Sequence, residues 1–413
     1  NQFMFSTDGK LFMSLPNQIS PRIGLIFDPW QNGRSKLYVS YARFYESVPL
    51  NILDRGIEPT TSKAVLPSSC DPRELSQATG ICQTDAARRV YAAGGGGWRG
   101  AGLPDRVYGP YGAGRGVLDP DLSPQSMTEV SAGGEYEIIK NGRIGLSYVR
   151  RWMNNVIEDM SNDEAATFFI GNPGKGIASS FPEAVRDYDS GSVYFTKAFA
   201  DAWLAQVSYT LSWLRGNIAG LYKPDTGQLD PNSNSTFDLK SLLVNQTGDL
   251  PGDHRHSIKV YAAKDIEITH ESLAQLGASV QARSGGPTNF LGAHPLYGAD
   301  EVFILPRGSG NRLPWNASLG THVGYGWRFE NGMSLSFTVD IFNLLNLQGA
   351  LSSDDRYTRV DVYPIAGGST ADLPSKVKGV TEKFVPASVN PNFGNPNYYQ
   401  EPRQFRFGVR GSF

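Results

Sequence analysis

Strict alternation of apolar and polar residues is the feature that most constrains how this chain of 413 residues can fold. In the segment WLAQVSYTLSWL, Trp203, Val207 and Trp213 fall on one side. Gln206 and Thr210 fall on the other side. Because successive side chains of a strand point to opposite faces of a sheet, the pattern predicts a strand whose two faces meet different solvents. The same alternation recurs in SLSFTVDIF and ends the chain in QFRFGVRGSF.

The pattern predicts eleven strands along the chain. They cover 22–29, 36–45, 127–138, 143–152, 186–198, 203–215, 253–264, 272–283, 314–329, 333–342 and 403–413. Residues 3–15 are predicted to form a further strand or a small hairpin. The connections hold 6, 81, 4, 33, 4, 37, 7, 30, 3 and 60 residues in order, so short and long alternate without exception. Several short connections contain Asn-Gly, which favours tight hairpin turns.

Connections that alternate in this way place all long loops at one end of the sheet. A soluble sandwich has no physical reason for that arrangement, whereas transmembrane β-barrels combine short periplasmic turns with long extracellular loops. Trp203 and Trp213 would stand about 25 Å apart along the membrane normal, which matches the two aromatic girdles of such barrels. The sequence therefore predicts an all-β, antiparallel transmembrane barrel wall, with 46–126 and 343–402 as long extracellular loops.

Composition narrows the class of protein further. Nucleic-acid-binding proteins usually carry a strongly positive charge, whereas the net charge here is -2, so no nucleic-acid partner is expected. Mean hydropathy is -0.32 and no run of 18 apolar residues exists, so no transmembrane helix is predicted. The chain starts at Asn1 in strand-like sequence without a signal peptide, and we expect a mature fragment whose true beginning lies upstream.

Five stretches carry a family resemblance: ISPRIGLIFDP, LYVSYARFYESVPLNILDR, PGDHRHSIKV, TVDIFNLLNLQ and FRFGVRGSF. They resemble TonB-dependent outer-membrane receptors, particularly the Oar-like branch with large surface loops, and DIFNLLN is the most specific piece. Such transporters have about 22 strands. The resemblance thus implies that residues 1–413 are the C-terminal half of the barrel. The first strands, the N-terminal plug and the TonB-binding box would lie outside this chain.

The resemblance implies TonB-dependent transport of a large substrate through a plugged barrel in the bacterial outer membrane. The implied partners are outer-membrane lipid, the TonB complex (through the missing N-terminal part), the barrel assembly machinery and a cargo that could be a peptide or a protein. The terminal aromatic Phe413 would be the assembly signal. Two alternatives stay open, an adhesive or structural surface protein and an ungated porin.

Polar side chains on the expected lumen face are candidate contacts for plug or cargo: Arg283, His322, Arg328, Asp340, Arg406 and Arg410. The glycine-rich stretch 91–116 could be a simple loop or a capture element. Its aromatic and arginine residues are of the types that anchor protein interfaces: Trp98, Arg99, Arg106, Tyr108, Tyr111 and Arg115. Cys70 and Cys82 are predicted to form a disulfide, because the spacing fits neither a zinc half-site nor a redox pair.

The sequence gives little indication of a metal site or of an enzyme active site. His254 and His256 would share a strand face, but no third ligand is near them in the sequence, so no metal and no cofactor are predicted. No Ser/His/Asp set, paired carboxylate site or nucleotide-binding motif stands out. We therefore do not expect an enzyme.

Overall fold

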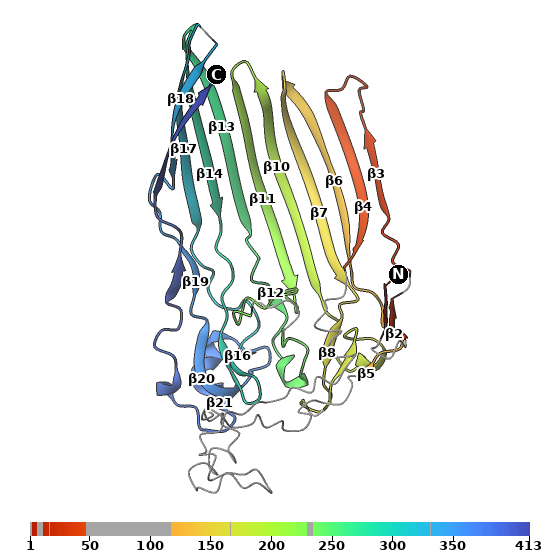
Figure 1. Cartoon of the computed structure of the whole chain (residues 1–413). Helices are drawn as coiled ribbons and strands as arrows, with labels where there is room; N and C mark the ends of the chain where they lie inside the picture. The colour runs from red at the N-terminus through yellow and green to blue at the C-terminus, as the bar shows by residue number, and fades with distance from the viewer. Residues whose placement is uncertain are drawn as a thin grey trace, which may run out of the picture.

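The computed structural model describes residues 2–5, 11–15, 17–46, 117–165, 167–228, 234–330 and 332–413. One antiparallel sheet dominates it, and eleven of its strands form a continuous path in chain order (Figure 1). These are β3 (Arg22–Phe27), β4 (Ser35–Tyr45), β6 (Ser126–Ile139), β7 (Gly142–Asn154), β10 (Arg186–Ala200), β11 (Trp203–Gly216), β13 (His256–Thr269), β14 (Ser272–Arg283), β17 (Asn316–Arg328), β18 (Ser334–Phe342) and β23 (Gln404–Ser412). The short β12 (Gly248–Asp249) pairs with the end of β11.

All eleven predicted strands are present, and ten of them begin and end within two residues of their predicted bounds. The segment expected at 253–264 forms strand only from His256, and it continues to Thr269. Asp253 and His254 lie instead in a turn, where the Asp253 amide donates to the Leu250 carbonyl at 2.8 Å. The hairpin expected within 3–15 is confirmed as β1 (Gln2–Phe5) paired with β2 (Leu11–Leu15).

The sheet has two different faces, because the register keeps residues of one kind in rows. Val207 lies in one row with Phe195 and Val260, whereas its neighbour Gln206 lies beside Thr196. Large apolar side chains are exposed on the same face in strand after strand: Leu25, Val39, Leu146, Val193, Val207, Leu276, Val323, Phe337 and Phe407. An exposed apolar face this wide is incompatible with water and suits the hydrocarbon of a bilayer.

Tight turns close one end of the sheet. Residues 140–141, 201–202 and 270–271 join consecutive strands, and these turns lie together at the top in Figure 1. Asn141 has φ 60°, and Asp201 and Ala202 have φ 54° and 62°. Positive φ is the geometry of the hairpin turns that match strand twist, which explains the predicted Asn-Gly turn. An alanine in that conformation shows that strand pairing on both sides can impose it.

The long connections meet at the opposite end and carry their own small sheets (Figure 1). The sheets consist of β5 (Val117–Leu118), β9 (Phe169–Gly171) and β8 (Glu158–Met160); of β16 (Gly298–Phe303), β15 (Leu291–His294), β20 (Arg356–Tyr363) and β21 (Lys378–Gly379); and of β19 (Ala350–Ser353) with β22 (Pro396–Tyr399). In the loop segments that the structure describes, five short helical turns accompany these sheets: η2 (Gly176–Ala178), η3 (Lys240–Leu242), η4 (Thr370–Asp372), α3 (Leu373–Lys376) and η5 (Pro386–Ser388). Within the described ranges, no helix is both long and apolar enough to cross a membrane.

Two buried apolar clusters of the described residues lie in these loops. The first loop core joins 155–185 to 217–255 and contains Val156, Met160, Phe169, Ala178, Phe181, Ile218 and Phe237. The second loop core joins 284–315 to 343–403 and contains Phe290, Val302, Ile304, Leu305, Val362, Leu373 and Val377. Burial of that much apolar surface makes the loops a packed cap rather than a set of loose connections.

Candidate functional site at the loop end of the sheet

A pocket of about 470 Å³ lies where the loop cap meets the ends of β13 and β14. We call it the mouth pocket. Its wall comes from three long connections, and its charged or polar lining includes Asp225, His254, Arg283, Asn289, Asp355 and Arg356. The volume is within the usual range of ligand sites, and charged groups of both signs give it the means to orient a polar ligand.

Of the predicted site residues that the structure describes, Arg283 alone lines this pocket. It ends β14, and its exposed side chain makes no hydrogen bond or ion pair with any residue that the structure describes. A free guanidinium at the rim of a pocket can hold a carboxylate or phosphate through two parallel hydrogen bonds. The structure therefore gives Arg283 a suitable place, and its contact with cargo stays a prediction.

A buried charge pair lies beneath the mouth pocket. Arg307 Nη1 donates to Asp225 Oδ2 at 2.7 Å, and both side chains are fully buried. Arg307 Nη2 also donates to Gln246 Oε1 at 2.6 Å, and its guanidinium lies over the Phe303 ring at 4.4 Å. Burial lowers the pKa of Arg307, which the attraction of Asp225 opposes. The pair ties connection 217–255 to connection 284–315.

Asn289 extends this network to a third connection. Its Nδ2 donates to Asp225 Oδ1 at 3.1 Å and to Asp355 Oδ2 at 3.2 Å, and its backbone N–H donates to Asp355 Oδ2 at 2.7 Å. Burial raises the pKa of Asp355 to about 6, although hydrogen bonds from Ser353 and Asn289 partly oppose the shift. The mouth pocket thus contains a carboxyl group that titrates near neutral pH.

The raised pKa of Asp355 predicts a pH-dependent loop cap. The pKa rises from 3.8 to about 6 on folding, so the stabilising effect is complete below pH 3.8 and is lost as pH rises through 6. Above that pH the charged form costs up to about 3 kcal/mol. We therefore expect Asp355→Asn to increase hydrogen-exchange protection in 284–315 relative to the unmodified protein. The gain should grow between pH 4 and 6 and then level off.

A carboxyl group with the opposite shift provides the control. Hydrogen bonds from Lys376 and Ser369 lower the pKa of Asp372 to about 2, so its stabilising effect is lost only as pH falls below 3.8. Asp372→Asn should change protection by a constant amount between pH 4 and 7. If the gain in protection from Asp355→Asn is equally independent of pH, the raised pKa of Asp355 is contradicted.

Three of the six predicted lumen residues form a cluster across neighbouring strands. His322, Asp340 and Arg406 are directly opposite one another in the register of β17, β18 and β23. Asp340 accepts from Arg406 Nε at 2.9 Å and lies 2.6 Å from His322 Nδ1. Arg328 and Arg410 lie nearer the short turns, and their side chains make no ion pair with a described residue.

The two histidines weighed as metal ligands do not share a site. His254 precedes β13, lines the mouth pocket and bonds through Nδ1 to the Ser284 carbonyl at 2.7 Å. His256 begins the strand, where its ring stacks on Tyr209 and on Trp315. The expectation that both point to one strand face is wrong, because the turn at 253–254 separates them. Among the described residues, no three His, Cys, Asp or Glu side chains are grouped to hold a metal.

Sequence reasoning missed Asp225, Asn289, Arg307 and Asp355. Asp225 belongs to the segment KPDTG, whose composition predicts an exposed turn rather than a buried ion pair. Its partner Arg307 is 82 residues away, and no periodicity links the two. The predicted loop residues Trp98, Arg99, Arg106, Tyr108, Tyr111 and Arg115 and the cysteines Cys70 and Cys82 lie outside the described residues.

Comparison with known proteins identifies a relative of this chain. No protein-family model matches it. The whole chain is 43% identical over 435 aligned residues to a curated protein of Myxococcus xanthus, TonB-dependent transporter Oar. The chain is a homologue of a TonB-dependent transporter. It spans 40% of the length of that relative. The match confirms the Oar-like resemblance predicted from the sequence.

Solved structures similar to this chain include a transporter and a receptor. The outer membrane transporter YddB from Escherichia coli has a TM-score of 0.46 and 14% identity, covering 80% of this chain and 37% of its own. BauA, the ferric preacinetobactin receptor from Acinetobacter baumannii, has a TM-score of 0.43 and 9% identity, covering 95% of this chain and 36% of its own.

Proposed function

We propose that this chain is the C-terminal half of a 22-stranded barrel that transports a large substrate across the outer membrane in a TonB-dependent way. The match of the whole chain to 40% of a TonB-dependent transporter is the observation that carries this proposal. The open sheet supports it, because β3 and β23 each pair along one edge within the described residues. Unpaired strand edges are costly in hydrocarbon, so the proposed barrel includes further strands that pair with these two edges.

The inner face of the sheet suits a removable plug. The cluster of His322, Asp340 and Arg406 presents polar groups to the lumen, and Arg328 and Arg410 add two cations that form no ion pair with a described residue. Contacts between hydrated polar walls adhere weakly, so a plug bound there could be displaced by force from TonB. The plug, TonB, the assembly machinery that would recognise Phe413 and the bridge between Cys70 and Cys82 belong to this proposal.

The mouth pocket and the stretch 91–116 would receive the cargo on the extracellular side. The cap is large and packed, which favours a peptide or protein over a small chelate. Arg283 at the pocket rim supplies a free cation for an acidic group of that cargo. An adhesin would bind the cargo without transporting it, whereas a porin would let the cargo cross without using the proton gradient.

Gradient-dependent uptake tests the proposal. Cells that carry the full-length protein are given fluorescein-labelled casein peptides, and the pool protected from external protease is measured. We expect accumulation that disappears on adding a protonophore or deleting TonB, because the plug moves only under force. Accumulation that ignores the protonophore would favour the porin. Surface binding without a protected pool would favour the adhesin.

A further inference from the structure

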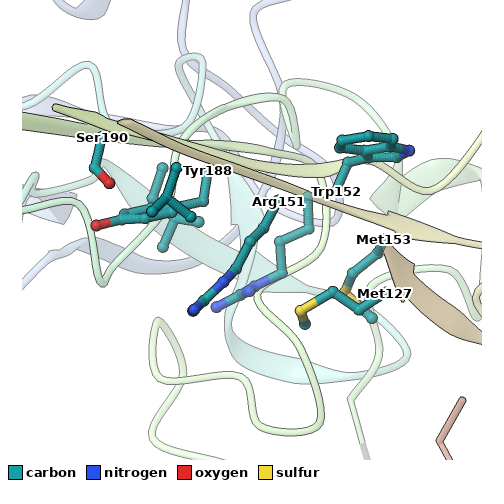
Figure 2. A pocket seen from close by; sticks show the side chains of 9 residues that line it. Met127, Arg151, Trp152, Met153, Tyr188 and Ser190 are labelled. Carbon is teal, nitrogen blue, oxygen red and sulfur yellow. The ribbon is translucent and has the colours of Figure 1, made fainter. Parts of the chain in front are cut away.

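A second pocket lies on the lumen face at the loop end of the sheet, where four strands meet. It encloses about 350 Å³ and is lined by Met127, Val149, Arg151, Trp152, Met153, Arg186, Tyr188, Ser190 and Leu214. We call it the arginine pocket. β6, β7, β10 and β11 hold it, and Met127 is directly opposite Met153 in their register. Figure 2 shows the two methionines side by side and Arg151 extending away from the sheet.

One of the two cations of this pocket has no ion-pair partner among the described residues. The lining contains two guanidinium groups and no carboxylate. Arg151 forms an ion pair with Glu129, which stands in the neighbouring strand. Arg186 has no carboxylate within ion-pair distance among the described residues, and its Nε donates only to the Ala219 carbonyl at 3.1 Å. One cation therefore remains available for a ligand that carries a single negative charge.

The rest of the lining is apolar and adaptable. Leu214 is buried, and Met153 packs against the first loop core, so the floor of the pocket is anchored by the cap. Methionine side chains adjust to ligands of varied shape, which makes them frequent in sites that accept many sequences. Tyr188 lies opposite Arg151 in the register and adds an aromatic ring to the lining. The site thus combines one cation with an apolar recess.

We propose that the arginine pocket binds the C-terminal carboxylate of a peptide whose last residue is apolar. A guanidinium matches a carboxylate through two parallel hydrogen bonds, and the recess has room for one large side chain. Within a peptide, only the C-terminus attaches a carboxylate directly to the carbon that carries an apolar side chain. This assignment rests on the proposed function for its choice of a peptide ligand.

The test measures binding to the full-length protein in lipid nanodiscs by calorimetry, with no proton gradient. The probe is a heptapeptide of alternating glycine and serine that ends in leucine, with a free carboxylate or with an amide. We expect the free acid to bind about tenfold more tightly, because only the carboxylate can form charge-assisted hydrogen bonds with the Arg186 guanidinium. Equal affinity of acid and amide for the unmodified protein would overturn the proposal without any mutation.

Arg186→Gln then completes a double-mutant cycle. It should weaken binding of the acid about tenfold and leave the amide unchanged, since the lost interaction needs both charges. Lys259→Gln is the matched control, because Lys259 is an exposed cation of the same face, between Ser208 and Gln281. It should change neither affinity. An equal loss for both peptides, or the same loss in the control, would overturn the assignment.

The outcome is separable from that of the transport experiment. If uptake does not depend on the gradient but Arg186→Gln weakens binding of the acid alone, transport is rejected and the peptide site is kept. If Arg186→Gln has no selective effect on binding of the acid but gradient-dependent uptake is normal, this site is rejected and transport is kept.

Discussion

Replacing Val207 by arginine should prevent most of the chain from reaching a folded barrel. Val207 lies between Trp203 and Trp213 along β11, with its side chain 41% exposed on the apolar face. An arginine at the bilayer midplane costs about 2–4 kcal/mol, which lowers the folding equilibrium by roughly 30- to 700-fold. The folded fraction can be measured by heat-modifiable gel mobility after refolding the full-length protein into vesicles.

The adjacent position provides the control. Gln206 points to the opposite, polar face, where its neighbours are Thr196 and Tyr261. Gln206→Arg introduces the same side chain one residue away and should fold like the unmodified protein. If the two variants fold equally well, either the register of β11 or its contact with lipid is wrong.

Removing the carboxylate of Asp225 should release the loop cap while the barrel stays folded. Arg307 would then be a fully buried cation without a carboxylate partner. Breaking a buried pair in this way costs about 3–5 kcal/mol. We expect Asp225→Ala to increase trypsin cleavage and hydrogen exchange in 284–315 and 343–403. Heat-modifiable mobility should not change, because the strands are held by their ladders and not by the cap.

Two further variants sharpen this result. Lys376→Ala removes an ion pair of 2.6 Å in which the lysine is 62% exposed, and surface pairs contribute about 0–1 kcal/mol. It should leave cap protection nearly unchanged. Asp225→Leu combined with Arg307→Met removes both charges and should recover much of the loss, because apolar replacements avoid the cost of an isolated charge. An intact cap in Asp225→Ala would show that the two loop cores hold these connections without the pair.

These two expected results separate what stabilises the wall from what stabilises the cap. The wall depends on backbone ladders and an apolar face whose solvent is lipid. The cap depends on two buried apolar clusters and a network of buried polar groups, as in a soluble domain. A change in one should therefore leave the other folded.

The sequence by itself determined the wall of the barrel. A strand period of two residues is local, so alternating runs such as WLAQVSYTLSWL place a strand and its two faces without knowledge of its neighbours. Turn chemistry is local as well, which is why the turn at Asn141 was predictable. Once the strands are paired, the alternation of side chains also places His322, Asp340 and Arg406 on one face of the sheet.

Only the tertiary structure decided the cap and its sites. Asp225 meets Arg307 and Asn289 meets Asp355 across separate connections whose residues show no period, so their burial depends on how the loops fold over one another. The same cause moved the start of β13 to His256, because Leu214 of β11 donates its N–H to Asp253 Oδ1 at 2.6 Å and holds the chain just before that strand. Local pattern fixes a strand in lipid, whereas packing between distant segments fixes a pocket.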